Sequence, residues 1–486
     1  MNDLTDLDAH ALSRAIHARA VSCREVMRAY LSRIDAVNAG VNAIVSRRPD
    51  VELLREADAC DAELAHGASR GWMHGMPQAI KDAAETQGLR TTLGSPLLAD
   101  HVPAHDALMV ARMKAAGCIV VGKTNTPEFG LGSHTFNEVF GVTRNAFDRS
   151  RSAGGSSGGA AVALATHMLP VADGSDFMGS LRNPAAWNDV YGFRPSQGRV
   201  PRWPVADAWV ALLSTEGPMG RTVHDVAALL DVQSGWDARV PTSIATKEAY
   251  AAHVDGLDPG GVRIGWLGDL GGYLAMEPGI AQLCERALKR IEGEGGAIEP
   301  IALGFAPERV WDAWLVWRRW SVAARIAPHL TNPANRARIK PEALWEYDQG
   351  QGLTGMDTVR ACAERTAFHT HLLTLFEHFD ALAIPTAQVW PFPAEWRWPQ
   401  QIAGHAMDTY HRWMEAVIYA TFAGLPCISM PVGFGKHGLP MGVQLIGKPH
   451  GDLGVLQLAR TYERIGVGPS KSLSAGGAES HRRERA

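Results

Sequence analysis

Short apolar runs bounded by glycine or proline alternate along the chain with stretches whose apolar residues recur at helical spacing. The runs predicted as buried strands are 119–121, 169–172, 262–266, 381–384, 427–431 and 443–446. The stretches predicted as helices are 106–116, 159–167, 223–230, 408–422 and 453–465. Strands that alternate with helices are typical of an α/β sheet with helices packed around it. The sequence therefore predicts an α/β fold.

Near the N-terminus, Ser22 and Glu25 form a capping box that predicts the start of a further amphipathic helix.

The composition is that of an ordinary globular protein, with 486 residues, a net charge of −4 and 20% charged residues. It lacks the basic excess of nucleic-acid-binding proteins, and no window reaches the ~18 consecutive apolar residues of a membrane span. We therefore expect neither a nucleic-acid partner nor a membrane partner. The acidic N-terminus does not resemble a signal peptide, which predicts a cytoplasmic protein.

The cysteines and histidines give no indication of a metal or cofactor. The six cysteines are scattered without a Cys-x-x-Cys pair, and the 19 histidines include no His-Glu-x-x-His pattern. We therefore expect no metal and no cofactor.

Three segments carry candidate chemistry: Lys81 in Ala-Ile-Lys-Asp, Ser156 in Gly-Gly-Ser-Ser-Gly-Gly, and Ser180 in Ser-Asp-Phe-Met-Gly-Ser-Leu-Arg. A hydroxyl is a poor nucleophile until a base takes its proton. A nucleophilic serine, a second serine and a buried lysine together supply the parts for acyl transfer without a metal.

The stretch 152–201, with its Gly/Ser-rich turn and its Asp-x-x-Gly-Ser-x-Arg-x-Pro-Ala run, resembles the amidase signature family. The resemblance extends through 122–125, 140–145, 217–219, 423–426 and 440–444. It implies a single large mixed β-sheet flanked by helices and one amidase signature domain over 1–468, with the core motif at 152–201. It also implies a variable, substrate-shaping segment at about 300–420. The Pro-containing stretch 235–261, which could be a linker, would then be an excursion within this domain, and 469–486 is predicted to be a disordered tail.

The resemblance implies a Ser-cisSer-Lys triad in which Ser180 is the nucleophile, Ser156 relays its proton and Lys81 is the base. It also implies a cis peptide bond between Gly155 and Ser156. An ordinary lysine is protonated at pH 7, so Lys81 must be buried, and lowering its pKa to roughly 7–8 corresponds to ~3–4 kcal/mol. Lys123 is the other candidate base, but it lies in the family's Gly-Lys-Thr-Asn segment and not at the base position.

The resemblance also implies that an oxyanion hole is built from backbone N–H groups of the turn that carries Ser180. The candidate donors are Phe177, Met178, Gly179 and Ser180. Met178 departs from the family's Gly-Gly-Ser pattern, so a residue with a Cβ must adopt the backbone that this turn demands. Supporting roles fall to Ser157, Asp176 and Arg182, the last two as a structural ion pair.

Two other motifs compete with this interpretation. The stretch 117–124 satisfies the Walker A expression and would indicate a nucleotide-binding protein, but a helical pattern precedes it and its central residues resemble a strand. The stretch 154–158 satisfies Gly-x-Ser-x-Gly, the nucleophile elbow of α/β-hydrolases, but no strand pattern comes before it.

The leading prediction is a free-standing amidase that hydrolyses a carboxamide, or an anilide, ester or carbamate, through an acyl-enzyme on Ser180. Trp311, Trp314, Trp317 and Trp320 recur every three residues, which fits either core packing or a pocket for a hydrophobic or aryl substrate. The alternatives are the glutamine-hydrolysing subunit of a tRNA-dependent amidotransferase, the nucleotide-binding protein and a catalytically silent binding protein. A homodimer is left open.

Overall fold

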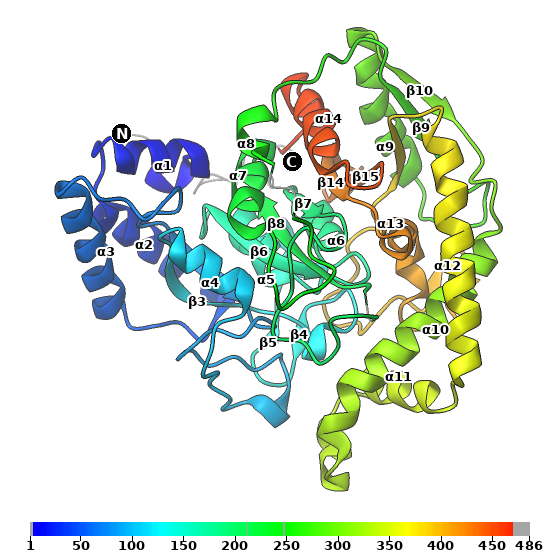
Figure 1. Ribbon diagram of the computed structural model, residues 1–486, viewed down its shortest axis with the longest axis horizontal. Helices are drawn as coiled ribbons and strands as arrows, with labels where there is room; N and C mark the ends of the chain where they lie inside the picture. Colours follow the sequence, from blue (N-terminus) through cyan, green and yellow to red (C-terminus); the bar gives the residue numbers. More distant parts are fainter. Residues whose placement is uncertain (1–2, 211, 246–247, 470–486) are drawn as a thin grey trace, which may run out of the picture.

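The computed structural model describes residues 3–210, 212–245 and 248–469, so most of the predicted disordered tail lies outside the described residues. Within these ranges the centre of the molecule is an eight-stranded mixed sheet, surrounded by helices (Figure 1), which confirms the predicted fold class. The strand order is β10-β9-β11-β15-β14-β7-β8-β6. The bounds are Val171–Asp176 (β6), Tyr191–Arg194 (β7), Thr215–Gly220 (β8), Arg263–Trp266 (β9), Ala297–Pro300 (β10), Ala381–Pro385 (β11), Cys427–Phe434 (β14) and Pro440–Gly447 (β15).

Within the large sheet, parallel pairing is confined to β10, β9 and β11, and the other neighbours run antiparallel. The strands β8 and β9 flank the stretch 235–261 and belong to this same sheet. That stretch is therefore an excursion between strands of one sheet and not a linker between two sheets.

Lys81 lies outside the large sheet, in a smaller one that accompanies it. It ends β2 (Pro77–Lys81), which pairs with β3 (Ile119–Thr124) in a three-stranded sheet of order β1-β3-β2, with β1 at Ile44–Val45. The backbone N–H of Lys81 donates to the carboxylate of Asp173 in β6 at 3.1 Å, so a side chain and not a backbone ladder joins the two sheets at this point.

Helices cover both sheets. The α-helices are Ala9–His17 (α1), Cys23–Val41 (α2), Asp50–Ala65 (α3), Leu108–Ala115 (α4), Gly158–Ala165 (α5), Arg182–Trp187 (α6), Val223–Gln233 (α7), Tyr250–His253 (α8), Ile280–Leu288 (α9), Pro307–Ile326 (α10), Pro341–Gln351 (α11), Gly355–Phe376 (α12), Ile418–Ala423 (α13) and Asp452–Arg464 (α14). Two further short ladders pair Phe136–Asn137 (β4) with Gly141–Val142 (β5), and Gln401–Ile402 (β12) with His405–Ala406 (β13). In Figure 1, α1 to α3 lie at one side of the molecule and α10 to α12 at the other.

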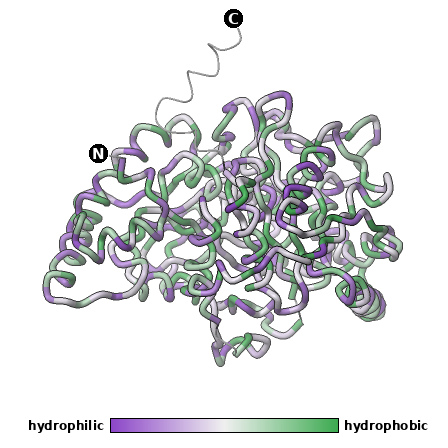
Figure 2. Tube along the Cα trace, turned by 90° about the horizontal axis from the view of Figure 1, so that it is seen from above, coloured by the Kyte–Doolittle hydropathy of each residue, from purple (hydrophilic) through white to green (hydrophobic). Residues whose placement is uncertain are grey.

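Figure 2 shows purple and green alternating along the outer helices, as expected for helices with one buried face. In α2 the capping box predicted at Ser22 and Glu25 is present, and Val26, Tyr30 and Ile34 are buried. None of the described helices is both long and apolar enough to cross a membrane.

The predicted helix 408–422 is wrong over most of its length. Arg412–Val417 forms a 3-10 helix in which Met414 has a non-helical backbone (φ −117°, ψ 26°), and only Ile418–Ala423 is α-helical. The buried Trp413 and Met414 pack in the large core cluster, so tertiary packing overrides the helical spacing here.

Candidate active site

The side chain of Lys81 is buried among three serine hydroxyls. Its Nζ lies 2.8 Å from Oγ of Ser156, 2.8 Å from Oγ of Ser157 and 3.0 Å from Oγ of Ser175. An uncharged amine has two N–H bonds and one lone pair. Two of these hydroxyls can therefore accept from the amine while the third donates to its lone pair, which is the arrangement that a proton acceptor requires.

Burial lowers the pKa of Lys81 to about 7, and the nearby carboxylates of Asp173 and Asp176 oppose this shift. Burial also raises the pKa of Asp173, which lessens the charge that could hold a proton on the lysine. A lysine with a pKa near 7 is about half uncharged at neutral pH, so it can take up a proton from a hydroxyl.

The glycine-rich loop that carries Ser156 is fixed by side chains that bind its carbonyl groups. Oγ of Ser133 donates to the carbonyl of Gly155 at 2.6 Å, and Oγ1 of Thr126 donates to the carbonyl of Ser156 at 3.0 Å. The peptide bond between Gly155 and Ser156 is cis, as predicted. The orientation of Ser156 towards Lys81 is thus set by contacts from several segments.

Ser180 lies in the turn between β6 and α6, next to the glycine-rich loop. The backbone N–H of Ser157 donates to the carbonyl of Ser180 at 3.1 Å, and Ser180 is 6% exposed. The hydrogen bonds of the described residues do not include one between the hydroxyls of Ser180 and Ser156. The fold therefore places the two segments in contact, and the role of Ser180 stays a prediction.

The turn demands glycine at position 179 and tolerates methionine at 178. Gly179 has φ +77°, and a Cβ there would lie 2.7 Å from a methyl group of Val417. Met178 is not among the described residues with positive φ. The left-handed conformation thus falls on Gly179, and the side chain at 178 does not strain the backbone.

Only part of the predicted set of oxyanion donors is available. The backbone N–H of Gly179 donates to Oδ1 of Asp176 at 2.8 Å, so this group is already engaged and does not fit the role. The N–H groups of Phe177, Met178 and Ser180 take part in none of the hydrogen bonds found among the described residues. These three are left as the candidate donors.

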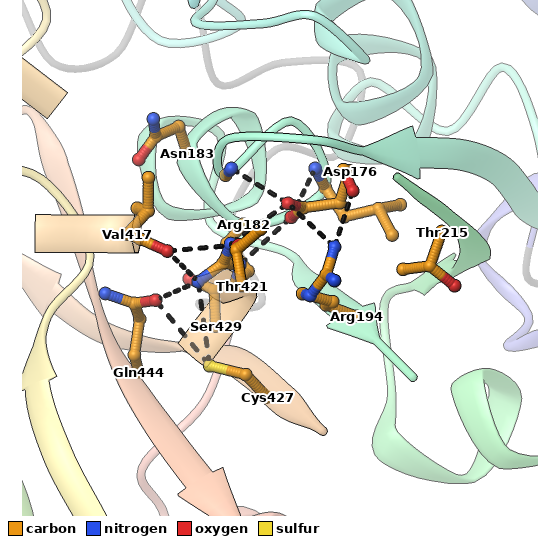
Figure 3. A network of polar contacts seen from close by, with 12 residues as sticks. Asp176, Arg182, Asn183, Arg194, Thr215, Val417, Thr421, Cys427, Ser429 and Gln444 are labelled. Carbon is orange, nitrogen blue, oxygen red and sulfur yellow. Dashed lines mark hydrogen bonds and ion pairs between the residues drawn. The ribbon is translucent and has the colours of Figure 1, made fainter. Parts of the chain in front are cut away.

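Asp176 fixes the turn that carries Ser180 through a fully buried network of ion pairs and hydrogen bonds (Figure 3). Its carboxylate pairs with Arg182 at 2.9 Å and with Arg194 at 3.6 Å, and Oδ2 accepts from the N–H of Leu181 at 3.2 Å. Arg182 also donates to the side chain of Gln444 in β15. The predicted ion pair between Asp176 and Arg182 is present, and it ties the turn to the large sheet.

The charges in this network keep Asp176 ionised. Burial alone would raise its pKa, but Arg182 and Arg194 lower it to about 2. Because the carboxylate stays charged at every working pH, it keeps accepting hydrogen bonds from the backbone N–H groups of Gly179 and Leu181.

Lys123 is buried but contacts none of the candidate serines. Its Nζ donates to the carbonyl of Ala84 at 2.6 Å and to Oγ1 of Thr86 at 2.7 Å. Burial lowers the pKa of Lys123 to about 8, against the opposing charge of Asp82. Because Lys123 lies inside β3 and no α-helix follows directly, the Walker A interpretation is wrong.

The nucleophile-elbow interpretation also lacks its parts. The residues before Ser156 form a loop and not a strand, and His134, which lies beside this loop, shares a hydrogen bond of 2.7 Å with Ser152. None of the hydrogen bonds among the described residues joins a histidine to Ser156.

The tryptophans of α10 are mainly core residues. Trp311, Trp314 and Trp317 are each 4% exposed or less and belong to the large hydrophobic cluster. Trp314 also reaches the turn, where its ring centre lies 5.6 Å from that of Phe177. The spacing of the tryptophans therefore reflects packing.

The sequence analysis did not predict three side chains that contact Lys81 or the turn of Ser180: Ser175, Asp173 and Arg318. Ser175 and Asp173 lie in β6, where two polar residues inside a buried strand were an available signal. Arg318 lies in α10 and contacts the turn through Met178, and no local sequence pattern predicts this contact. Within the described ranges no group of three or more His, Cys, Asp or Glu could hold a metal ion.

Comparison with known proteins decides the family. The family model described as Amidase matches residues 25–456. The chain belongs to the amidase family. Accordingly, it is an enzyme that acts on amide C–N bonds.

Known members of the family match this chain over nearly its whole length. A glutamyl-tRNA(Gln) amidotransferase subunit from Moorella thermoacetica is 34% identical, over 95% of this chain and 97% of that protein. A bacterial aryl acylamidase of the amidase signature family has a similar structure, with a TM-score of 0.88, 29% identity and coverage of 95% and 96%. The corresponding amidotransferase subunit from Thermotoga maritima has a TM-score of 0.81 and 28% identity, with coverage of 98% and 99%.

Proposed function

We propose that this amidase-family enzyme cleaves its amide through an acyl-enzyme on Ser180, with Ser156 as relay and Lys81 as base. The observation that carries the proposal is the buried Nζ of Lys81, 2.8 Å from Oγ of Ser156. The contact between Ser157 N–H and the Ser180 carbonyl supports it, because this contact keeps the two serine segments together.

In the first half of the reaction, Oγ of Ser180 attacks the amide carbonyl carbon. Its proton passes to Ser156, whose own proton passes to the uncharged Lys81. The N–H groups of Phe177, Met178 and Ser180 would bind the oxygen on which negative charge develops. The C–N bond then breaks, and the amine leaves with the proton that Lys81 returns through Ser156.

In the second half, water attacks the acyl carbonyl and gives its proton to Lys81 by the same route. The bond between Ser180 and the acyl carbon breaks, the serine is reprotonated and the carboxylic acid departs. Asp176 and Arg182 hold the turn throughout, and Ser157 and Ser175 keep the lysine oriented.

Two substrate classes fit this chemistry. The 34% identity to an amidotransferase subunit supports the glutamine-hydrolysing subunit of a tRNA-dependent amidotransferase, and the sequence relatives favour it over a free-standing amidase. The TM-score of 0.88 to an aryl acylamidase, and the partly exposed ring of Phe177 in the turn that carries Ser180, favour a free-standing amidase for a hydrophobic or aryl amide. The expectation of a small-molecule substrate with no nucleic-acid partner therefore stays a prediction.

The nucleophile is tested by labelling the full chain with a fluorophosphonate and mapping the adduct by mass spectrometry. We expect the adduct on Ser180 and a loss of turnover of about 10⁴-fold or more in Ser180→Ala. Ser156→Ala should slow labelling of Ser180 without moving the adduct. An adduct on Ser156 in the unaltered chain would contradict the proposal.

The substrate class is tested on the same preparation with glutamine, acetamide, a long-chain amide and an anilide. Glutamate release that exceeds hydrolysis of the other three supports the amidotransferase function. Hydrolysis of the anilide or long-chain amide without glutamate release supports the free-standing amidase.

A further inference from the structure

One helix of the segment 300–420 contacts the turn that carries Ser180. In α10, Trp314 packs on the ring of Phe177, and Arg318, one helical turn later, lies over the same ring with its guanidinium carbon 5.3 Å from the ring centre. Residues four apart lie on one face of a helix, so α10 presents both side chains to the turn together.

Arg318 also binds the neighbouring residue of the turn. Its Nη1 donates to Sδ of Met178 at 3.6 Å. A single guanidinium therefore contacts both Phe177 and Met178, whose backbone N–H groups are two of the three candidate oxyanion donors.

The guanidinium itself is held in place by a buried network. Arg318 Nε donates to Oε1 of Glu346 in α11, and Nη2 donates to the hydroxyl of Tyr410 at 2.6 Å. That hydroxyl donates in turn to Oε1 of Glu346 at 2.8 Å. Arg318 and Glu346 are 1% and 0% exposed, so neither can exchange its partner for water without a large cost.

Methionine at position 178 makes such a contact necessary. Its side chain has three rotatable bonds and adapts to many shapes, so on its own it would fix the turn poorly. Asp176 braces the far side of the turn through Gly179 and Leu181, and its carboxylate hydrogen bonds do not extend to Phe177 or Met178.

We propose that Arg318 is a positioning residue that fixes the backbone at Phe177 and Met178 by holding their side chains, and that it acts on the reaction through Met178. This inference rests on the proposed function of Ser180. It makes α10 and α11 determinants of turnover, because they supply Arg318 and Glu346 of the network that aims the oxyanion donors.

The test is a double-mutant cycle on the full chain, with Arg318→Lys and Met178→Gly. Lysine keeps the positive charge beside Glu346 but loses the planar contact with the turn. Oxyanion donors act mainly in the transition state, so Arg318→Lys should lower kcat by about tenfold or more and change KM by less than about threefold. In the Met178→Gly background the same substitution should lower kcat by only about twofold.

Controls separate positioning from general loss of stability. Tyr410→Phe removes the hydroxyl and with it two hydrogen bonds of the network, but leaves the contact between Arg318 and Glu346, and should lower kcat in the same direction by a smaller factor. Arg199→Lys alters another buried arginine, whose Nε donates to Asp452 at 3.2 Å, and should leave kcat unchanged at a temperature where the variant is folded. Urea unfolding of each variant establishes that temperature.

The result distinguishes this inference from the proposed function. If the unaltered chain labels at Ser180 but the effects of Arg318→Lys and Met178→Gly on kcat multiply independently, Arg318 is only structural and the inference fails alone. If the unaltered chain does not label at Ser180, the proposed function fails and this inference fails with it.

Discussion

Replacing Lys81 by methionine should abolish activity and make the protein more stable. A fall of the pKa from 10.5 to about 7 means that burial disfavours the charged lysine by about 5 kcal/mol. Methionine is unbranched, of similar length and never charged. It loses the hydrogen bonds to Ser156, Ser157 and Ser175, at about 1 kcal/mol each. The net expected gain in the free energy of unfolding is therefore about 2 kcal/mol at pH 7.

The gain should depend on pH with a definite sign. Between pH 7 and 10.5 the lysine is protonated in the unfolded chain but largely uncharged in the folded one, so folding releases a proton. The cost of burying Lys81 is complete below pH 7 and declines by about 1.4 kcal/mol per pH unit until pH 10.5. The advantage of Lys81→Met should decline with it and reverse in sign at about pH 8.5.

Urea unfolding of both proteins at pH 6.5, 7.5, 8.5 and 9.5 measures this difference directly. Lys448→Met, which alters an exposed lysine, serves as the control and should show no comparable slope. A difference between Lys81→Met and the unaltered chain that stays constant from pH 6.5 to 9.5 would show that Lys81 keeps an ordinary pKa. It would then be charged at neutral pH and could not serve as the base.

Further outcomes concern the same site and its supports. In the unaltered enzyme kcat/KM should fall about tenfold per pH unit below about pH 7, since only uncharged Lys81 accepts a proton, and a profile that is flat from pH 5 to 7 would exclude this base. Lys123→Met should leave the midpoint of that profile unchanged, because Lys123 contacts Ala84 and Thr86 and not the serines. Asp176→Asn should lower the free energy of unfolding by about 3–5 kcal/mol in urea titrations, because it leaves Arg182 buried without its counter-ion, and a loss below about 1 kcal/mol would refute that role. In acid the stabilisation from Asp176, about 2 kcal/mol, is complete above pH 4 and is lost as the pH falls towards 2, which acid unfolding of the variant and the unaltered chain should show. Activity should survive EDTA, since the proposed steps use only serine and lysine, and a loss that added metal restores would contradict them.

Local patterns in the sequence settled those features whose physics is local. The capping box at Ser22 starts α2 because a hydroxyl and a carboxylate three residues apart satisfy the helix's first N–H groups wherever they occur. The apolar runs 381–384, 427–431 and 443–446 became strands of the large sheet because each is bounded by turn residues and largely buried. The motif around Ser180 predicted the ion pair of Asp176 with Arg182, whose partners lie in the same turn.

The tertiary structure decided what depends on distant segments. Lys81 comes to face Ser156 because β2 belongs to a second sheet packed beside β6, and no pattern near Lys81 contains this information. Its lowered pKa follows from burial by several elements together, whereas its own neighbours in sequence fit an exposed strand end equally well. Met178 acquires an ordinary backbone and a partner only through Gly179 and Arg318, the second of which lies far along the chain. Hydrophobic periodicity predicts which residues are buried, but it does not predict which residues they contact. The hydrophobic effect has no preferred direction, whereas hydrogen bonds and ion pairs depend on where the partner groups lie.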